Sequence, residues 1–128
     1  MRCVDTTFLI DVLRGEPRVR AIFDELNASG EFYTTSVSAF ELLSGAFQLG
    51  KAREQSARLL LSRFTILELD LSAAEKAARI YAQCRRDGQE IPADDALIAG
   101  ITLSNGCTLV TNDLNHYKRV PGLKISGW

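Results

Sequence analysis

Acidic side chains stand at four points where the chain passes from one expected element to the next, and these residues are the best suited to chemistry. They are Asp5 after the apolar residues CV, Glu41 in an apolar helical pattern, the pair Asp94-Asp95 before ALI, and Asp113 shortly after LVT. Carboxylates brought together repel one another, and a divalent cation removes that repulsion. Oxygen ligands without a cluster of His or Cys favour magnesium or manganese over zinc. A metal site of this kind hydrolyses phosphate esters.

Each acid also has a local explanation, because carboxylates near a helix start accept hydrogen bonds from free backbone N–H groups. Asp5 could cap the first helix, and Asp113 could cap a short helical turn. Ser38 and Glu41 have the spacing of a capping box, in which the glutamate braces its own helix. Capping explains the joint pattern less well, since Asp5 and Asp95 lie in apolar sequence where an uncompensated carboxylate is costly.

The other reactive residue types form no recognisable site. His116 is the only histidine, has no expected ligand partner, and is expected on the surface or at the rim of a site. Cys3, Cys84 and Cys107 lie far apart without a CxxC pair, so we expect small buried side chains rather than a zinc site or disulfides. The chain carries no glycine-rich phosphate loop and no serine–histidine nucleophile.

The elements that must position the acids alternate between short apolar strands and amphipathic helices. Strands are expected at 2–5, 32–35, 64–69 and 107–111, with an edge strand at 123–125. Helices are expected at 6–14, 17–28, 36–49, 51–63, 72–86 and 94–104, with a helical turn at 112–118. This alternation is typical of a parallel sheet with helices on both faces. The sequence predicts a single α/β domain over residues 1–128, with three α/β/α layers and four to five parallel strands.

This topology would bring the acids together, because ligands of open parallel sheets bind outside the carboxyl ends of the strands. Asp5 and Asp113 follow the first and fourth strands, and Glu41 lies in the first turns of the helix after the second. The pair Asp94-Asp95 opens the helix that leads into the fourth strand. We therefore expect all of these acids near one edge of the sheet.

Composition limits the class of protein. The chain has 128 residues, of which 46% are hydrophobic and 24% charged, as in a globular domain. Its net charge of −1 argues against a passive nucleic-acid coat protein, but not against an enzyme acting on nucleic acid. No apolar run is long enough to cross a membrane, and the acid at position 5 interrupts any signal sequence, so a cytoplasmic location is expected.

Four segments, in order, resemble the motifs of PIN-domain ribonucleases, and the end of the chain is similar to the tail of bacterial and archaeal VapC-type toxins. The segments are VDTTFLI (4–10), SVSAFELLSG (36–45), DALIAG (95–100) and LVTND (109–113), with a tail from VPGL (120–123) to residue 128. Helical periodicity does not separate Asp94 from Asp95. The family's register does, because its acid directly precedes the x-Leu-Ile-Ala-Gly stretch, which selects Asp95 and leaves Asp94 as the helix N-cap.

The resemblance implies a compact α/β/α fold and an endoribonuclease toxin that depends on Mg²⁺ or Mn²⁺. It also implies a homodimer, an RNA substrate and a neutralising antitoxin protein. The metal and catalytic residues that it implies are Asp5, Glu41, Asp95 and Asp113. The hydroxyl and polar groups that would orient water or substrate are Thr6, Thr111 and Asn112. Many relatives carry a further acid after the fourth motif, whereas LNH (114–116) follows here, so a second ion would be held weakly or only with RNA phosphate.

Surface roles are less specific. Candidates for contact with an RNA backbone are Arg14, Arg18, Arg20, Lys51, Arg53, Lys118 and Arg119. The apolar faces of the helices at 36–49 and 51–63 could serve a dimer, an antitoxin or the core.

Three alternatives remain from the sequence. One is a catalytically weak PIN-like module that binds RNA or a protein. A phosphatase of the haloacid-dehalogenase kind would need an aspartate two residues after Asp5, where Thr7 stands. A receiver-like signalling module would need an acidic pair near the first strand, which the chain does not offer.

Overall fold

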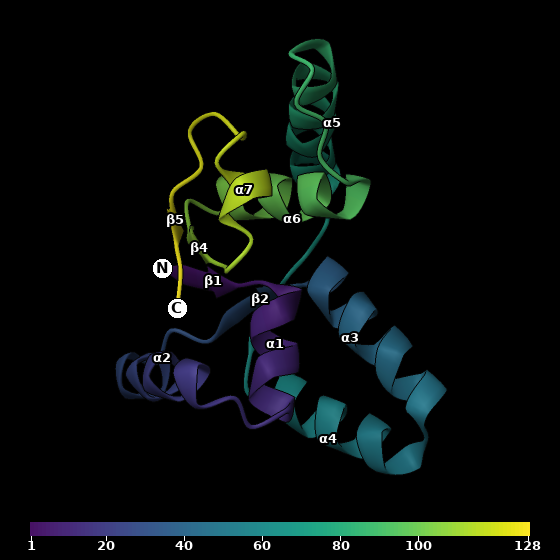
Figure 1. Ribbon diagram of the computed structural model, residues 1–128, viewed down its shortest axis with the longest axis vertical. Coiled ribbons are helices and arrows are strands. Elements are labelled where there is room, and N and C mark those ends of the chain that lie inside the picture. The colour runs from purple at the N-terminus through teal and green to yellow at the C-terminus, as the bar shows by residue number, and fades with distance from the viewer.

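A computed structural model describes all residues, 1–128, and shows helices on both faces of a central sheet (Figure 1). The strands are β1 (Arg2–Val4), β2 (Tyr33–Thr35), β3 (Thr65–Leu67), β4 (Thr108–Val110) and β5 (Ile125–Ser126). The helices are α1 (Thr6–Leu13), α2 (Pro17–Ser29), α3 (Ser36–Leu49), α4 (Lys51–Leu61), α5 (Leu71–Arg86), α6 (Ala93–Ser104) and α7 (Leu114–Tyr117). The predicted three-layer α/β/α architecture is confirmed.

All five strands run parallel, in the order β3-β2-β1-β4-β5. Val4 lies opposite Thr34 of β2 on one side and Val110 of β4 on the other. The residues that follow these strands therefore emerge side by side at the carboxyl edge. The chain turns to one side after β1 and to the other after β3, so the strand order reverses beside β1, where ligand sites of such sheets form.

Alternating side chains of the strands supply two cores. Val4 and Val110 face the layer of α1 to α4, where they pack with Phe8 and Leu9 among others. Cys3 and Leu109 face the layer of α5 to α7. Because both faces are covered, the last two residues of β1, β2, β3 and β4 are all apolar or buried. All three cysteines are buried and unpaired, as predicted.

The contact between α5 and α6 depends on a glycine. A Cβ added at Gly100 would lie 2.6 Å from the carbonyl oxygen of Ala73 and 2.7 Å from the Cβ of Ala77. Both distances are closer than atoms can approach, so only glycine allows α6 to lie this near to α5. Since α6 begins with the twin aspartates, this packing fixes where their carboxylates point.

The residues SAAE (72–75) have the spacing of a capping box, which predicts that Ser72 caps the helix expected at 72–86. That prediction is wrong, because α5 begins at Leu71 and Asp70 is its cap, accepting a hydrogen bond from the Ala73 N–H at 2.9 Å. No helix has both the length and the apolarity to cross a bilayer.

Candidate functional site

Asp5 is both a helix cap and a member of the acidic cluster, so the capping and metal-site interpretations of this residue are compatible. It follows β1 directly, and its Oδ1 accepts a hydrogen bond from the N–H of Phe8 at 2.9 Å. Its Oδ2 accepts a hydrogen bond from the hydroxyl of Thr111 at 2.5 Å. The residue is only 3% exposed. Burial raises the pKa of Asp5 from near 3.8 to about 6, although both hydrogen bonds oppose that rise.

The turn after β4 connects Asp5 to Asp113. The fully buried hydroxyl of Thr111 donates to Asp5 and also accepts a hydrogen bond from the N–H of Asp113 at 2.9 Å. Thr111 therefore positions two carboxylates at once. Asn112 does something different, because it is exposed and its Oδ1 accepts a hydrogen bond from the N–H of Trp128 at 3.1 Å. That contact fastens the end of the chain to the β4 turn.

Glu41 faces the cluster rather than bracing its own helix. The cap of α3 is Thr35, whose hydroxyl accepts from the N–H of Ser38 at 3.0 Å. The capping-box reading of Glu41 is therefore wrong, since the helix begins before Ser38 and places Glu41 in its second turn. The hydroxyl of Thr6 donates to Glu41 Oε1 at 2.6 Å. Burial, followed by the neighbouring Asp94 carboxyl, raises the pKa of Glu41 to about 7.

Both twin aspartates lie in the first turn of α6, and neither is its cap. The predicted N-cap role of Asp94 is wrong, because Pro92 occupies the cap position and makes no side-chain cap. The pyrrolidine ring fixes φ of Pro92 at −59°, which ends the extended segment two residues before Asp94. Asp94 instead lies beside Glu41, and its charge contributes to the raised pKa of Glu41. Asp95 is half-buried, and burial raises its pKa as well.

His116 lies among the acids, against the expectation that it would have no partner. Its Nδ1 is 2.8 Å from Oδ2 of Asp95 and 2.8 Å from Oδ2 of Asp113. The expected rim position is correct, since 36% of its side chain is exposed. The neighbouring hydroxyl of Tyr117 donates to Oδ1 of Asp95 at 3.3 Å. The spacing Asp113-x-x-His116 at a helix start was the sequence signal for this contact.

Together these residues line a cleft of about 260 Å³ at the carboxyl edge of the sheet. Its walls are Asp5, Thr6, Thr7, Ile10, Glu41, Asp94, Asp95, Ile98, Asp113 and Tyr117. The cleft thus brings together all four predicted acids and Asp94, and no Lys or Arg lines it. Sequence reasoning had not placed Asp94 or Tyr117 in the site.

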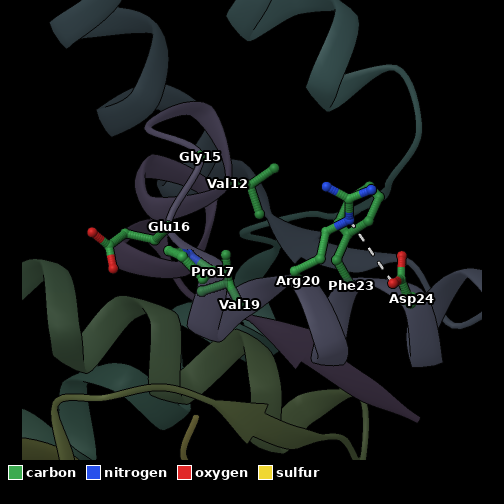
Figure 2. Close-up of a pocket in the computed structure, with 8 residues that line it drawn as sticks. All are labelled: Val12, Gly15, Glu16, Pro17, Val19, Arg20, Phe23 and Asp24. Carbon is green, nitrogen blue, oxygen red and sulfur yellow. Dashed lines mark ion pairs between the residues drawn. The ribbon is translucent and has the colours of Figure 1, made fainter.

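Another hollow, of about 490 Å³, lies between α1 and α2, and Figure 2 shows its lining. Two of its charged side chains form an ion pair, with Arg20 lying 3.9 Å from Asp24. Its remaining lining is mostly apolar or glycine, including Val12 and Phe23. It therefore lacks the convergent titratable groups that distinguish the acidic cleft.

The donor set of the acidic cleft suits a divalent cation. Asp95, Asp113 and His116 offer ligand atoms that all lie within 4.8 Å of one another. Five carboxyl groups in a cleft lined by no Lys or Arg repel one another, and burial, together with this repulsion, raises the pKa values of Asp5, Glu41 and Asp95. Carboxylate oxygens are the ligands that Mg²⁺ and Mn²⁺ prefer.

Known proteins are similar to this chain in sequence and in fold. Residues 2–123 match the family described as PIN domain. The tRNA(fMet)-specific endonuclease VapC of Salmonella typhimurium is 32% identical, over 98% of this chain and 96% of the relative. A solved DNA-bound VapBC from Salmonella typhimurium has a TM-score of 0.84 at 27% identity, covering 99% of this chain and 97% of that one. VapBC2 from Rickettsia felis, bound to a promoter DNA fragment, has a TM-score of 0.88 at 23% identity, covering 99% and 98%.

These likenesses extend over nearly the whole chain, so they concern the entire fold rather than one motif. They exclude the phosphatase and receiver alternatives, which belong to other families. The match to the PIN-domain description and the 32% identity to a VapC protein agree with the four acidic motifs in order. The chain belongs to the PIN-domain family, in its VapC group.

Proposed function

We propose that residues 1–128 act as one PIN domain, an endoribonuclease toxin that depends on Mg²⁺ or Mn²⁺ and is neutralised by a cognate antitoxin. The observation that carries the proposal is the convergence of five carboxyl groups in one cleft, free of Lys and Arg, at the reversal point of the sheet. Within it, Asp5, Glu41, Asp95 and Asp113 would hold the cation. The ribonuclease names of relatives such as the Salmonella VapC support the reaction.

A divalent ion held there would neutralise phosphate charge and supply a water acidic enough to attack near neutral pH. The chain's own residues prepare the site for it. Thr111 holds Asp5 and the Asp113 backbone in fixed relation, and Thr6 holds Glu41. These hydrogen bonds hold the carboxylate oxygens of Asp5 and Glu41 and the turn that carries Asp113. The side chains that would bind the ion are therefore ordered before any ion or substrate arrives.

The RNA backbone needs cationic contacts, and these lie outside the cleft. Arg14 and Arg53 line the groove that adjoins the site at Glu41, so we favour them among the predicted basic residues. Arg18 forms a long ion pair with Glu16, the cap residue of α2, and Arg20 forms one with Asp24 within α2, at 3.9 Å each. A relative is named for tRNA(fMet), and we propose initiator tRNA as the first substrate to test.

The test is cleavage of defined RNAs, with initiator tRNA included, by purified protein with Mg²⁺ or Mn²⁺. We expect cleavage by the wild type and a loss of at least about a hundredfold for Asp5→Asn, because a metal ligand and its charge disappear. Asp24→Asn is the matched control, since it makes the same chemical change on the exposed face of α2. Cleavage by Asp5→Asn at the wild-type rate would refute the assignment. Metal binding without cleavage of any RNA would favour a PIN-like module that binds but does not cut.

The antitoxin has a suitable surface beside the site. A groove of about 190 Å³ between α1, α3 and α4 is lined by Ile10, Leu13, Arg14, Glu41, Leu42, Gly45, Ala46, Leu49 and Arg53. Leu49 is 69% exposed within this lining. The solved neighbours are toxin–antitoxin complexes, so we propose that the antitoxin covers this groove. Leu49→Glu should then weaken the complex without unfolding the free chain, as measured by titration calorimetry.

A homodimer would use a different apolar surface. Val37, Phe40, Leu69 and Leu97 line a hollow of about 480 Å³ that Glu41 and Asp94 also border. Phe40 is 70% exposed, which is unusual for a large aromatic side chain in a monomer. We propose that two copies pair there, which would set their acidic clefts close together. Sedimentation should then show a dimer for the wild type and a monomer for Phe40→Glu.

A further inference from the structure

His116 makes two short contacts that one proton cannot satisfy. Its Nδ1 lies 2.8 Å from a carboxylate oxygen of Asp95 and 2.8 Å from one of Asp113. An imidazole nitrogen carries at most one hydrogen. The two carboxylate oxygens must therefore share that hydrogen, or one of them receives no hydrogen bond from Nδ1. A cation among the three atoms satisfies all of them, because both carboxylates and a lone pair on Nδ1 can then point at the same charge.

Nδ1 of His116 lies at ligand-to-ligand distance from both carboxylate oxygens. Neighbouring ligands on an octahedral ion with bonds of about 2.1 Å lie about 3 Å apart. The two 2.8 Å separations agree with that distance, and all three atoms lie within 4.8 Å of one another. The backbone helps, since Asp113 caps α7 by accepting from the His116 N–H at 3.3 Å, which fixes both residues in one turn.

We propose that His116 Nδ1 is a metal ligand beside Asp95 and Asp113, and that this nitrogen shifts the preference of the site from Mg²⁺ toward Mn²⁺. The inference rests on the proposed function, because it concerns the same acidic cleft. Mg²⁺ is a hard ion that takes oxygen ligands, whereas imidazole is a ligand of transition-metal ions.

The chain permits an unambiguous test, since His116 is its only histidine. In untagged protein loaded with Mn²⁺, electron spin echo spectroscopy should detect ¹⁴N modulation from a coordinated imidazole. His116→Asp should abolish that modulation while placing an oxygen near the former position of Nδ1. Asn115→Ala is the matched control, because it alters an exposed neighbour on the same turn and should keep the modulation.

Titration calorimetry gives the second readout. We expect His116→Ala to weaken Mn²⁺ binding about tenfold and Mg²⁺ binding much less. We expect His116→Asp to reduce the difference in affinity between Mn²⁺ and Mg²⁺. Circular dichroism should show both variants folded, since the His116 side chain contacts only the two acids among the polar groups of the structure. Equal losses for both ions, or wild-type Mn²⁺ spectra without imidazole modulation, would overturn the proposal.

The outcomes separate this inference from the proposed function. Metal-dependent RNA cleavage by the wild type without imidazole modulation would overturn the histidine ligand and leave the ribonuclease standing. Imidazole modulation in a protein that cleaves no RNA would support the ligand and overturn the ribonuclease. Absence of any metal binding by the wild type would overturn both.

Discussion

The replacement Asp5→Asn should make the metal-free protein more stable at neutral pH while removing its proposed activity. Burial raises the pKa of Asp5 from near 3.8 to about 6 in the folded chain. A carboxyl group whose pKa is raised by folding contributes stability that is complete below its unfolded pKa and is lost as the pH rises through its folded pKa. The two values differ by about two pKa units, so the carboxylate costs about 3 kcal/mol above pH 6.

Asparagine cannot ionise, so the variant escapes that cost but loses other contacts. Its carboxamide keeps an acceptor for the N–H of Phe8, while its NH₂ group meets the hydroxyl of Thr111 less well, which costs about 1 kcal/mol at any pH. We therefore expect Asp5→Asn to be about 2 kcal/mol more stable than the wild type near pH 7.5 and slightly less stable near pH 4.

Urea unfolding in a chelator, at both pH values, measures this change of sign. The difference between the two pH values should be about 2.5 kcal/mol, because a small part of the cost is already present at pH 4, and it does not depend on the packing cost, which is the same at both. The exposed replacement Asp24→Asn should show no such pH dependence. Mn²⁺ at a hundred times the wild-type Kd should remove most of the variant's advantage near pH 7.5, because the wild type gains about 2.7 kcal/mol and the variant, which lacks one ligand, gains less. A stability difference that stays constant with pH would refute the electrostatic account of Asp5.

Further outcomes follow from the same contacts. Gly100→Ala should destabilise the chain by about 1–3 kcal/mol, because its Cβ would lie 2.6 Å from a backbone oxygen of α5, whereas Gly45→Ala should stabilise it by about 0.5–1 kcal/mol in urea unfolding. Thr6→Val should raise the pKa of Glu41 further by removing its hydroxyl donor, which would move the acid limb of the cleavage profile to higher pH. Asp94→Asn should move that limb to lower pH by removing a neighbouring charge.

The fold could be predicted because short apolar runs and amphipathic segments alternate along the chain with little ambiguity. Parallel strands bring their carboxyl ends to one edge, so the meeting of Asp5, Glu41, Asp95 and Asp113 follows from topology. Helix starts were less predictable, since each depends on one hydrogen bond to a single N–H. The cap of α3 is Thr35, three residues before the serine that the capping-box spacing selects.

Two side-chain contacts in the site join residues far apart in sequence and could not be predicted from helical or strand periodicity. His116 reaches Asp95 across 21 positions, and the contact depends on how the four-residue α7 is oriented over α6. The helical pattern of α6 does not show which side chain Asp94 meets outside its own helix. Asp94 lies beside Glu41 because α3 packs against α6. In both cases the decisive term is the packing of two helices that are far apart in sequence.

The distribution of charge implies an order of binding. The cleft holds five carboxyl groups and no basic residue, so without a cation it repels an RNA phosphate. Arg14 and Arg53 lie in the adjoining groove, where they can attract the RNA backbone but cannot offset charge inside the cleft. If the chain is the proposed metal-dependent ribonuclease, the cation should bind before the scissile phosphate enters, and an antitoxin over the groove would block the arginines without removing the ion.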